Sequence, residues 1–237
     1  MDLPDLPRFY VPSVEVGERL VLDEEEFRHA RVLRLEPDSK VHLINGKGAL
    51  YNGFITIKKR AAEILVDSVA HEKPEPSSAL ILGIAPTKNI SRFEWVVEKA
   101  TELGVSAIYP ILCEHSERDR LKLDRLQKIV ISAMKQSKRL WMPKLMTLSN
   151  FHEVLSIDAD EKFIAHCHDE QKLPISSLSH PKKIRLVLVG PEGDFSNNEI
   201  DQAKKSSFQS ISLGEARLRT ETAAIAICVY SNLASNQ

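Results

Sequence analysis

The chain has 237 residues, 43% of them apolar, with 32 basic and 33 acidic side chains. This size and apolar content allow a substantial buried core, and no apolar run approaches the roughly 20 residues of a membrane-spanning helix. We therefore expect a globular protein without a membrane segment. The N-terminus, MDLPDLPRFY, has neither a basic start nor an apolar stretch, so we expect no secretion signal and a cytoplasmic location.

The first part of the chain is rich in predicted β-structure. Its three strand-like runs cover residues 40–45, 50–57 and 62–69. A helix is expected over residues 23–35, because its early residues are acidic and its later ones are arginines. Together these elements predict a small β-barrel with one helix.

Two basic segments are candidates for RNA contacts. Arg28, Arg31 and Arg34 share one side of the predicted helix by their spacing of three, although ordinary surface arginines have the same pattern. Between Arg118 and Lys144 there are nine basic residues and two acidic ones. Such a local excess suits a polyanion, and a solvated helix face is the alternative.

The polar stretch 71–78 contains two prolines and has the composition of an interdomain linker. We place a domain boundary there, with domains over residues 1–72 and 73–237. The second domain alternates strands with helices, which predicts an α/β fold with a parallel sheet. The strands are expected at 80–85, 106–112, 162–166, 184–189 and 210–213, and helices at 93–103, after residue 118, at 197–207 and at 220–232.

Two polar loops follow predicted strands of this sheet: VGPEGDFS at 189–196 and LGEARLRTET at 213–222. Open α/β sheets bind ligands at the carboxyl ends of their strands, so we expect the two loops to form one site. Gly190 and Gly193 allow close backbone approach, whereas Glu192 and Asp194 would repel a triphosphate. A neutral or cationic ligand fits better, and a purely structural turn is the alternative.

Together the two loops resemble the cofactor loops of SPOUT-class RNA methyltransferases. The greatest similarity is to the RsmE family, which methylates N3 of a uridine in 16S ribosomal RNA. Similar segments are found at RFY (8–10), HARVLR (29–34), EKATELGV (98–105) and Gln136-Ser137 with Arg139. Two positions depart from the family pattern. Asp194 stands where the family usually has a second glycine, and Ala216 stands where it has an arginine, with Arg217 one place later.

The resemblance implies a PUA-like β-barrel followed by a SPOUT-type parallel sheet with a C-terminal trefoil knot. It further implies S-adenosylmethionine as cofactor, 16S ribosomal RNA or the small ribosomal subunit as partner, and a homodimer. The expected cofactor contacts are His166, Leu188, Val189, Gly190, Pro191, Glu192, Gly193, Leu213, Gly214, Leu218, Arg219, Thr220 and Thr222. The expected RNA contacts are Arg8, Arg28, Arg31, Arg34, Lys135, Lys138 and Arg139.

Methylation of uracil N3 requires loss of the imide proton and alignment of the nitrogen with the methyl donor. We expect Arg219 to stabilise the developing uridine anion, with Glu192 or Glu221 as a weaker candidate for the base. An ion pair of Arg219 with either glutamate is the structural alternative.

Other functions have less support in the sequence. No G-x-G-x-x-G and no phosphate-binding P-loop pattern occurs, which disfavours a nicotinamide or nucleotide enzyme. The run His166-Cys167-His168-Asp169 has residue types that bind metals, but no second cluster lies at finger-like spacing, so we expect His166 or Cys167 to line a third loop and no metal. Three widely spaced cysteines predict reduced, buried thiols. A non-catalytic RNA-binding or ribosome-assembly protein stays open as an alternative.

Overall fold

The structure is a computed structural model that describes residues 4–178 and 183–235. Its internal contacts divide the chain into two units. The first unit is Met1–Glu75 with Met134–Met142, and the second is Pro76–Ala133 with Pro143–Gln237. The sequence pattern placed a boundary after residue 72 and did not anticipate that Met134–Met142 packs with the first unit.

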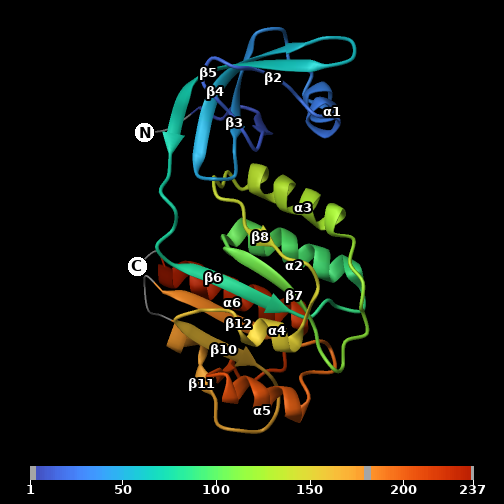
Figure 1. The fold of residues 1–237 in the computed structure, drawn as a ribbon, viewed down its shortest axis with the longest axis vertical. Coiled ribbons are helices and arrows are strands. Elements are labelled where there is room, and N and C mark those ends of the chain that lie inside the picture. The colour runs from blue at the N-terminus through green and yellow to red at the C-terminus, as the bar shows by residue number, and fades with distance from the viewer. Residues whose placement is uncertain (1–3, 179–182, 236–237) are drawn as a thin grey trace. The chain divides into compact units, whose positions relative to one another are not determined.

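The first unit is built on five strands that curl into a half-barrel (Figure 1). In sheet order these are β1 (Arg8–Tyr10), β3 (Ser39–Ile44), β4 (Ala49–Ile57), β5 (Ala62–Glu72) and β2 (Arg19–Val21). Strand β1 runs parallel to β3, and the other pairs are antiparallel. The predicted strands are confirmed, whereas the three-residue edge strands β1 and β2 are too short to show an alternating pattern. Strand β5 extends through Glu72 into the expected linker.

Helix α1 (Glu24–Val32) begins as predicted, because the side chain of Asp23 accepts a hydrogen bond from the amide of Glu26. It ends earlier than predicted, at Val32 with Leu33 as its C-cap, and Arg34 has a left-handed backbone with φ 52°. The expectation that Arg34 shares a helix face with Arg28 and Arg31 is therefore wrong.

The segment 134–142 packs on the first unit through apolar and backbone contacts. Met134 and Leu140 join a buried cluster with Ile44 and Leu50. The indole nitrogen of Trp141 donates hydrogen bonds to the carbonyls of Lys73 and Pro74, at 3.0 and 3.1 Å. These contacts bring the Trp141 ring close to Gly48, in the turn that joins β3 to β4.

The second unit contains an eight-stranded sheet, and every pair of its described strands is parallel, which confirms the predicted α/β class. Its longer strands are β6 (Ala79–Ile84), β7 (Ala107–Leu112), β10 (Glu161–Ala165), β12 (Ile184–Val189) and β13 (Gln209–Ser212). Three two-residue strands, β8 (Lys144–Leu145), β9 (Ser149–Asn150) and β11 (Leu173–Pro174), were not predicted because so short a run carries no pattern.

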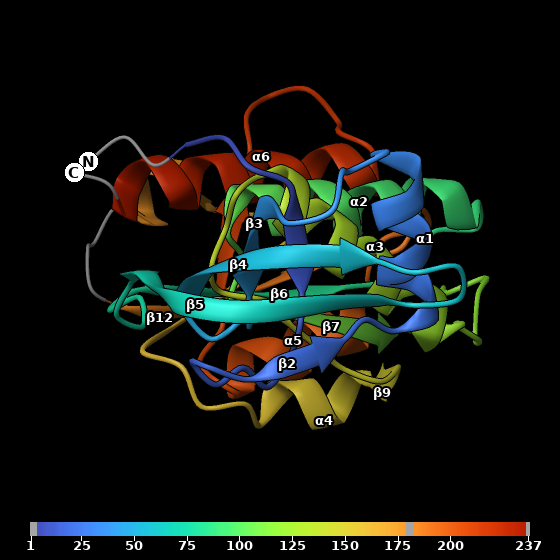
Figure 2. The same cartoon turned by 90° about the horizontal axis from the view of Figure 1, so that it is seen from above.

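Helices cover both faces of this sheet. Helices α2 (Ile90–Leu103) and α6 (Thr220–Ser235) lie side by side on one face, and α4 (Phe151–Leu155) and α5 (Asn197–Lys205) lie on the other (Figures 1 and 2). On the second face Leu186 and Leu188 of β12 pack against both helices in one buried cluster. Helix α3 (Leu123–Gln136) was expected, whereas α4 and the 3-10 turn Ile175–Leu178 were not. Among the described residues no helix is long and apolar enough to cross a membrane.

The turn between β3 and β4 provides a stability test. Gly48 has φ 96°, and a β-carbon there would lie 2.4 Å from the Lys73 carbonyl and 2.8 Å from the ring of Trp141. We expect Gly48→Ala to lower the free energy of unfolding by more than about 2 kcal/mol, since conformational strain adds to the clash. Gly17 is the control, because it has φ 87° but open space around a β-carbon, so Gly17→Ala should cost only about 1 kcal/mol. Equal losses for the two variants in urea unfolding would contradict the packing argument.

Candidate active site

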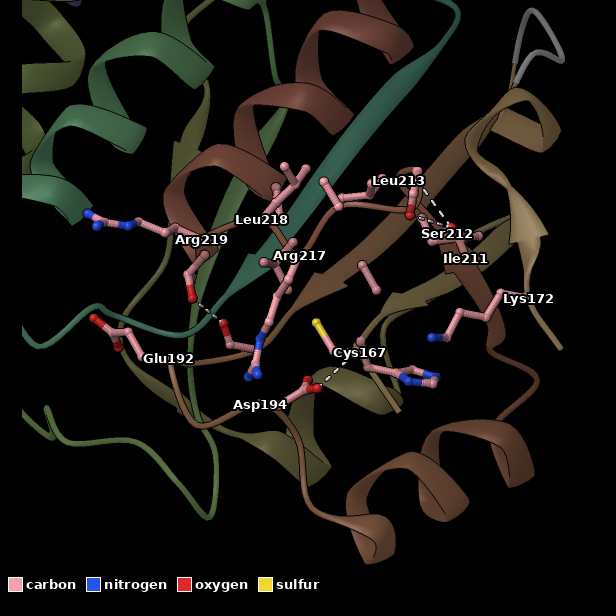
Figure 3. Close-up of a pocket in the computed structure, with 18 of the residues that line it drawn as sticks. Cys167, Lys172, Glu192, Asp194, Ile211, Ser212, Leu213, Arg217, Leu218 and Arg219 are labelled. Atoms are coloured by element: carbon pink, nitrogen blue, oxygen red, sulfur yellow. Dashed lines mark hydrogen bonds between the residues drawn. The ribbon is translucent and has the colours of Figure 1, made fainter. Parts of the chain in front are cut away.

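The second unit contains a cavity of about 560 Å³ at the carboxyl ends of β10, β12 and β13 (Figure 3). Its walls come from the three segments that follow these strands. Gly190 and Gly214 both line it, so the two loops singled out in the sequence face one shared space. The volume lies within the roughly 300–1,000 Å³ range of small-molecule sites.

Most residues expected at a cofactor lie on this cavity. Leu188 instead packs in the core, Gly193 backs onto His115, and Thr222 is exposed outside the cavity on α6. Ten of the thirteen expected residues line it: His166, Val189, Gly190, Pro191, Glu192, Leu213, Gly214, Leu218, Arg219 and Thr220.

Further lining residues were not among the expected contacts. Ala165 and Ile211 end β10 and β13, and the rule that ligands bind at carboxyl ends of strands could have found them. No local signal marks Lys172, which lies seven residues after the end of β10 at Ala165. Cys167, which was named with His166 as a candidate for the third loop, also lines the cavity. The other additional lining residues are Asp194, Ser212, Glu215, Ala216, Arg217 and Ala223.

A buried hydrogen bond joins two of the walls. The hydroxyl of Thr220, the first residue of α6, donates to the carbonyl of Gly190 at 3.0 Å. Gly214 has φ 118°, a backbone conformation that glycine adopts without strain. The chain therefore leaves β13 through a glycine turn and returns to the end of β12 at Thr220.

The turn after β12 is held by its glycines and by the start of α5. A β-carbon on Gly190 would come within 3.1 Å of the Phe195 ring, and one on Gly193 within 2.9 Å of the β-carbon of His115. The predicted capping box is confirmed: Ser196 and Glu199 exchange side-chain to backbone hydrogen bonds.

The three catalytic candidates differ in position. Glu192 lines the cavity and accepts a hydrogen bond from the amide of Lys88 at 3.0 Å. Glu221 lies 3.5 Å from Arg92, is only 12% exposed and does not line the cavity. Arg219 is exposed, and its guanidinium has no partner among the described residues, so the alternative ion pair with either glutamate is absent there.

Figure 3 separates the two arginines of the second loop. The side chain of Arg217 runs into the cavity toward the turn that carries Glu192 and Asp194, whereas that of Arg219 points away from it. The guanidinium of Arg217 therefore lies inside the cavity, whereas that of Arg219 is accessible to a molecule that binds next to the cavity.

His166 and two of the three cysteines have structural surroundings, whereas Cys167 is exposed, so its expected burial is wrong. The imidazole of His166 is fully buried, with Nε2 at 2.9 Å from the Ser210 hydroxyl and 3.1 Å from Glu170, and burial lowers its pKa. His166 therefore reaches the cavity by its backbone. Cys113 and Cys228 are buried, and burial raises the pKa of Cys228 to about 12. In the described part of the chain no group of three or more His, Cys, Asp or Glu could hold a metal ion.

Several expected RNA contacts have partners within the first unit. Lys135 forms an ion pair with Glu26, and the two side chains are only 15% and 4% exposed. Lys138 pairs with the exposed Asp5 at 2.7 Å, and burial lowers the pKa of Arg139. The ammonium of Lys135 is therefore used to neutralise Glu26 and is poorly placed to bind a phosphate.

The remaining expected RNA contacts lie in the N-terminal part of the same unit. Arg8 is half-buried, and burial lowers its pKa. Arg28 is paired with Glu24 at 3.3 Å on an exposed helix surface, and Arg31 lies over the Phe27 ring at 6.0 Å. Arg31 and Arg34 are exposed and, unlike Arg28, form no ion pair among the described residues.

Comparison with known proteins places this chain among RNA-modifying enzymes. Residues 73–232 match the RNA methyltransferase domain family, and residues 22–67 match the RNA methyltransferase PUA domain family. The fold and cavity thus define a SPOUT-type RNA methyltransferase with a PUA domain.

Individual relatives narrow the class. The chain is 32% identical to ribosomal RNA small subunit methyltransferase E of Aquifex aeolicus, over 89% of this chain and 93% of the relative. It is 32% identical to the crystal structure of that enzyme from Neisseria gonorrhoeae bound to S-adenosylmethionine, with a TM-score of 0.82 and coverage of 94% and 95%. A Legionella pneumophila protein in complex with the same cofactor is 28% identical, with a TM-score of 0.88 and coverage of 98% and 99%. The chain belongs to the ribosomal RNA small subunit methyltransferase E family.

The bond between the two loops predicts how the site depends on Thr220. Removal of a buried hydrogen-bond donor leaves the Gly190 carbonyl unsatisfied, so we expect Thr220→Val to lower the free energy of unfolding by about 1–3 kcal/mol. Thr220→Ser keeps the hydroxyl and should recover most of this loss. Thr222→Val, at an exposed position of the same helix, should change stability by less than about 0.5 kcal/mol. Equal effects at positions 220 and 222 in urea unfolding would show that the bond is unimportant.

Proposed function

We propose that this protein transfers a methyl group from S-adenosylmethionine to N3 of a uridine in small-subunit (16S) ribosomal RNA. The observation that carries the proposal is the single cavity shared by the loops after β12 and β13, in a chain whose relatives include an enzyme solved with this cofactor. Calorimetry with S-adenosylmethionine, followed by mapping of modified uridines in ribosomal RNA of cells that lack the protein, tests it directly. Saturable binding with loss of one N3-methyluridine supports it, and no cofactor binding favours a non-catalytic RNA-binding protein.

The cavity suits this cofactor chemically. Its wall carries two carboxylates, Glu192 and Asp194, and two cations, Lys172 and Arg217, which suits a ligand that has charges of both signs, as S-adenosylmethionine does. Apolar side chains such as Val189 and Leu218 also line it. Gly214 presents backbone without a side chain, and a β-carbon added there would meet nothing within 4 Å. The backbone of Gly190, Leu213, Gly214 and Leu218 would hold the adenosine part.

S-adenosylmethionine supplies an electrophilic methyl group when it is bound. The protein must then orient the uracil and remove the N3 proton as the new nitrogen–carbon bond forms. Negative charge develops on the imide and spreads to its carbonyl oxygens, where a guanidinium stabilises it. Arg219 has this role in our proposal, since its exposed side chain has no protein partner among the described residues.

Glu192 is the better placed of the two candidates for the base. It lines the cavity, and the Lys88 amide uses only one of its carboxylate oxygens. Glu221 is nearly buried beside Arg92 and outside the cavity, so it serves better to hold α6 against α2. In this scheme the N3 proton passes to Glu192 and then to solvent.

The proposal extends to location and assembly. A ribosomal substrate implies that the protein works in the cytoplasm, where ribosomes are assembled. We also propose a homodimer and a C-terminal trefoil knot, as the resemblance to the SPOUT class implies. Analytical ultracentrifugation tests the dimer.

The role of Arg219 predicts a separation of catalysis from cofactor binding. Loss of one charge-stabilising donor costs on the order of 100-fold in rate, so Arg219→Ala should lower kcat by about 100-fold. Its Kd for S-adenosylmethionine should change by less than about threefold. Methyl transfer to ribosomal RNA and calorimetry measure the two quantities, and wild-type turnover in this variant would remove the assignment.

Arg217→Ala is the matched comparison, because it removes the guanidinium that enters the cavity (Figure 3). A charge-assisted hydrogen bond to the cofactor carboxylate would be lost, so we expect its Kd to rise about tenfold. If Arg217→Ala affected only kcat and Arg219→Ala only Kd, the two roles would have to be exchanged.

Exposed arginines of the first unit predict salt-dependent RNA binding. Each lost phosphate contact reduces the slope of log K against log salt by about 0.7 for a single strand, so Arg31→Ala with Arg34→Ala should reduce it by about 1.4. Lys205→Ala, which removes an exposed charge on α5 outside both basic segments, serves as control. Filter binding at several salt concentrations measures the slopes, and an unchanged slope in the double variant excludes these phosphate contacts.

A further inference from the structure

Asp194 occupies a strained position in the turn after β12. Its backbone has φ 65°, in the left-handed region, and its amide donates to the carbonyl of Pro191 at 2.9 Å. Glycine adopts this conformation at no cost, whereas aspartate tolerates it better than most other residues. An aspartate here therefore calls for a compensating role of its side chain.

The contacts of Asp194 reach three strand-end segments. One carboxylate oxygen accepts a hydrogen bond from the Cys167 amide at 2.8 Å, after β10, and the other accepts from the Phe195 amide at 2.9 Å, after β12. Its carbonyl accepts a hydrogen bond from Nδ1 of His115 at 3.1 Å, after β7. A single residue thus joins segments that start from three different strands.

A second histidine strengthens the same junction. Nε2 of His168 donates to the carbonyl of Phe195 at 2.8 Å and lies 3.9 Å from the Asp194 carboxylate. The Asp194 side chain is only 14% exposed, so water competes weakly for these bonds. Hydrogen bonds to an ionised carboxylate are about twice as strong as neutral ones.

We propose that Asp194 is a positioning residue that fastens the loops after β7, β10 and β12 to one another and so shapes the cofactor cavity before the cofactor arrives. The proposal rests on the function proposed above. Its physical basis is preorganisation: loops that are already ordered lose less conformational entropy on binding, and affinity rises accordingly. Asp194 acts through the backbone of Cys167 and Phe195, and no contact with the cofactor is required.

A direct electrostatic role makes a different prediction. If the carboxylate acted mainly by attracting the sulfonium charge, its removal would weaken binding of S-adenosylmethionine far more than of S-adenosylhomocysteine, which lacks that charge. A positioning role weakens both ligands by the same factor. The pair of ligands therefore distinguishes the two roles.

Two substitutions separate the backbone requirement from the side-chain bonds. Asp194→Gly suits the left-handed backbone but removes both acceptors, whereas Asp194→Asn tolerates that backbone and keeps one acceptor oxygen. Asp169→Asn is the matched control, because Asp169 is exposed in the loop after β10 and its side chain has no partner among the described residues.

The first measurement needs no ligand. Hydrogen exchange of the Cys167 amide, followed by NMR, should be at least about tenfold faster in Asp194→Gly than in the wild type. The increase should be smaller in Asp194→Asn and absent in Asp169→Asn. Wild-type protection of this amide in Asp194→Gly would overturn the proposal.

The second measurement is calorimetry with both ligands. Asp194→Gly should raise the Kd of S-adenosylmethionine and of S-adenosylhomocysteine by the same factor, about tenfold, and Asp194→Asn should recover most of it. A loss confined to S-adenosylmethionine, or no loss, would overturn the positioning role. If the wild type bound neither ligand, the proposed function would fail, while the exchange of the Cys167 amide would still decide whether Asp194 fastens the loops.

Discussion

The parallel direction of the strands in the second unit is the constraint on which its site depends. Parallel strands bring their carboxyl ends to one edge, so loops that are far apart in the sequence meet there. The hydrogen bond from Thr220 to the Gly190 carbonyl closes this arrangement, because it joins the start of α6 to the end of β12. Gly214, with φ 118°, lets the chain turn between them. The cavity exists because these loops face one another across a short distance.

Charge is distributed differently in the two units. In the cavity, Glu192 and Asp194 are accompanied by Lys172 and Arg217, so opposite charges share one small space. The ammonium of Lys172 donates to the carbonyl of His168 at 2.6 Å, which keeps it on the wall. In the first unit the burial of Glu26 requires a cation, and Lys135 supplies it. A basic residue in a basic segment is therefore not always available to a phosphate.

Local patterns predicted the long elements and the caps. Apolar repeats marked α2, with Gly104 as its left-handed C-cap, and the Ser196–Glu199 pattern marked the start of α5. Strands β8, β9 and β11 were not predicted, because a strand of two residues shows no periodicity. The first helix was predicted to continue to residue 35, beyond the end of α1. Arginines are good helix formers, and nothing in the sequence marks the left-handed turn at Arg34.

The amino-acid sequence by itself determined the fold class, the order of the main elements and the two loops at the site, because these follow from short-range periodicity, capping and glycine placement. Only the tertiary structure decided which side chains face the cavity. The side chain of Arg217 points into the cavity and that of Arg219 points away from it, although they are two residues apart. Lys172 and Asp194 line the cavity, whereas Thr222 does not. The reason is physical: side-chain direction at a loop depends on backbone angles and on contacts between segments that are distant along the chain.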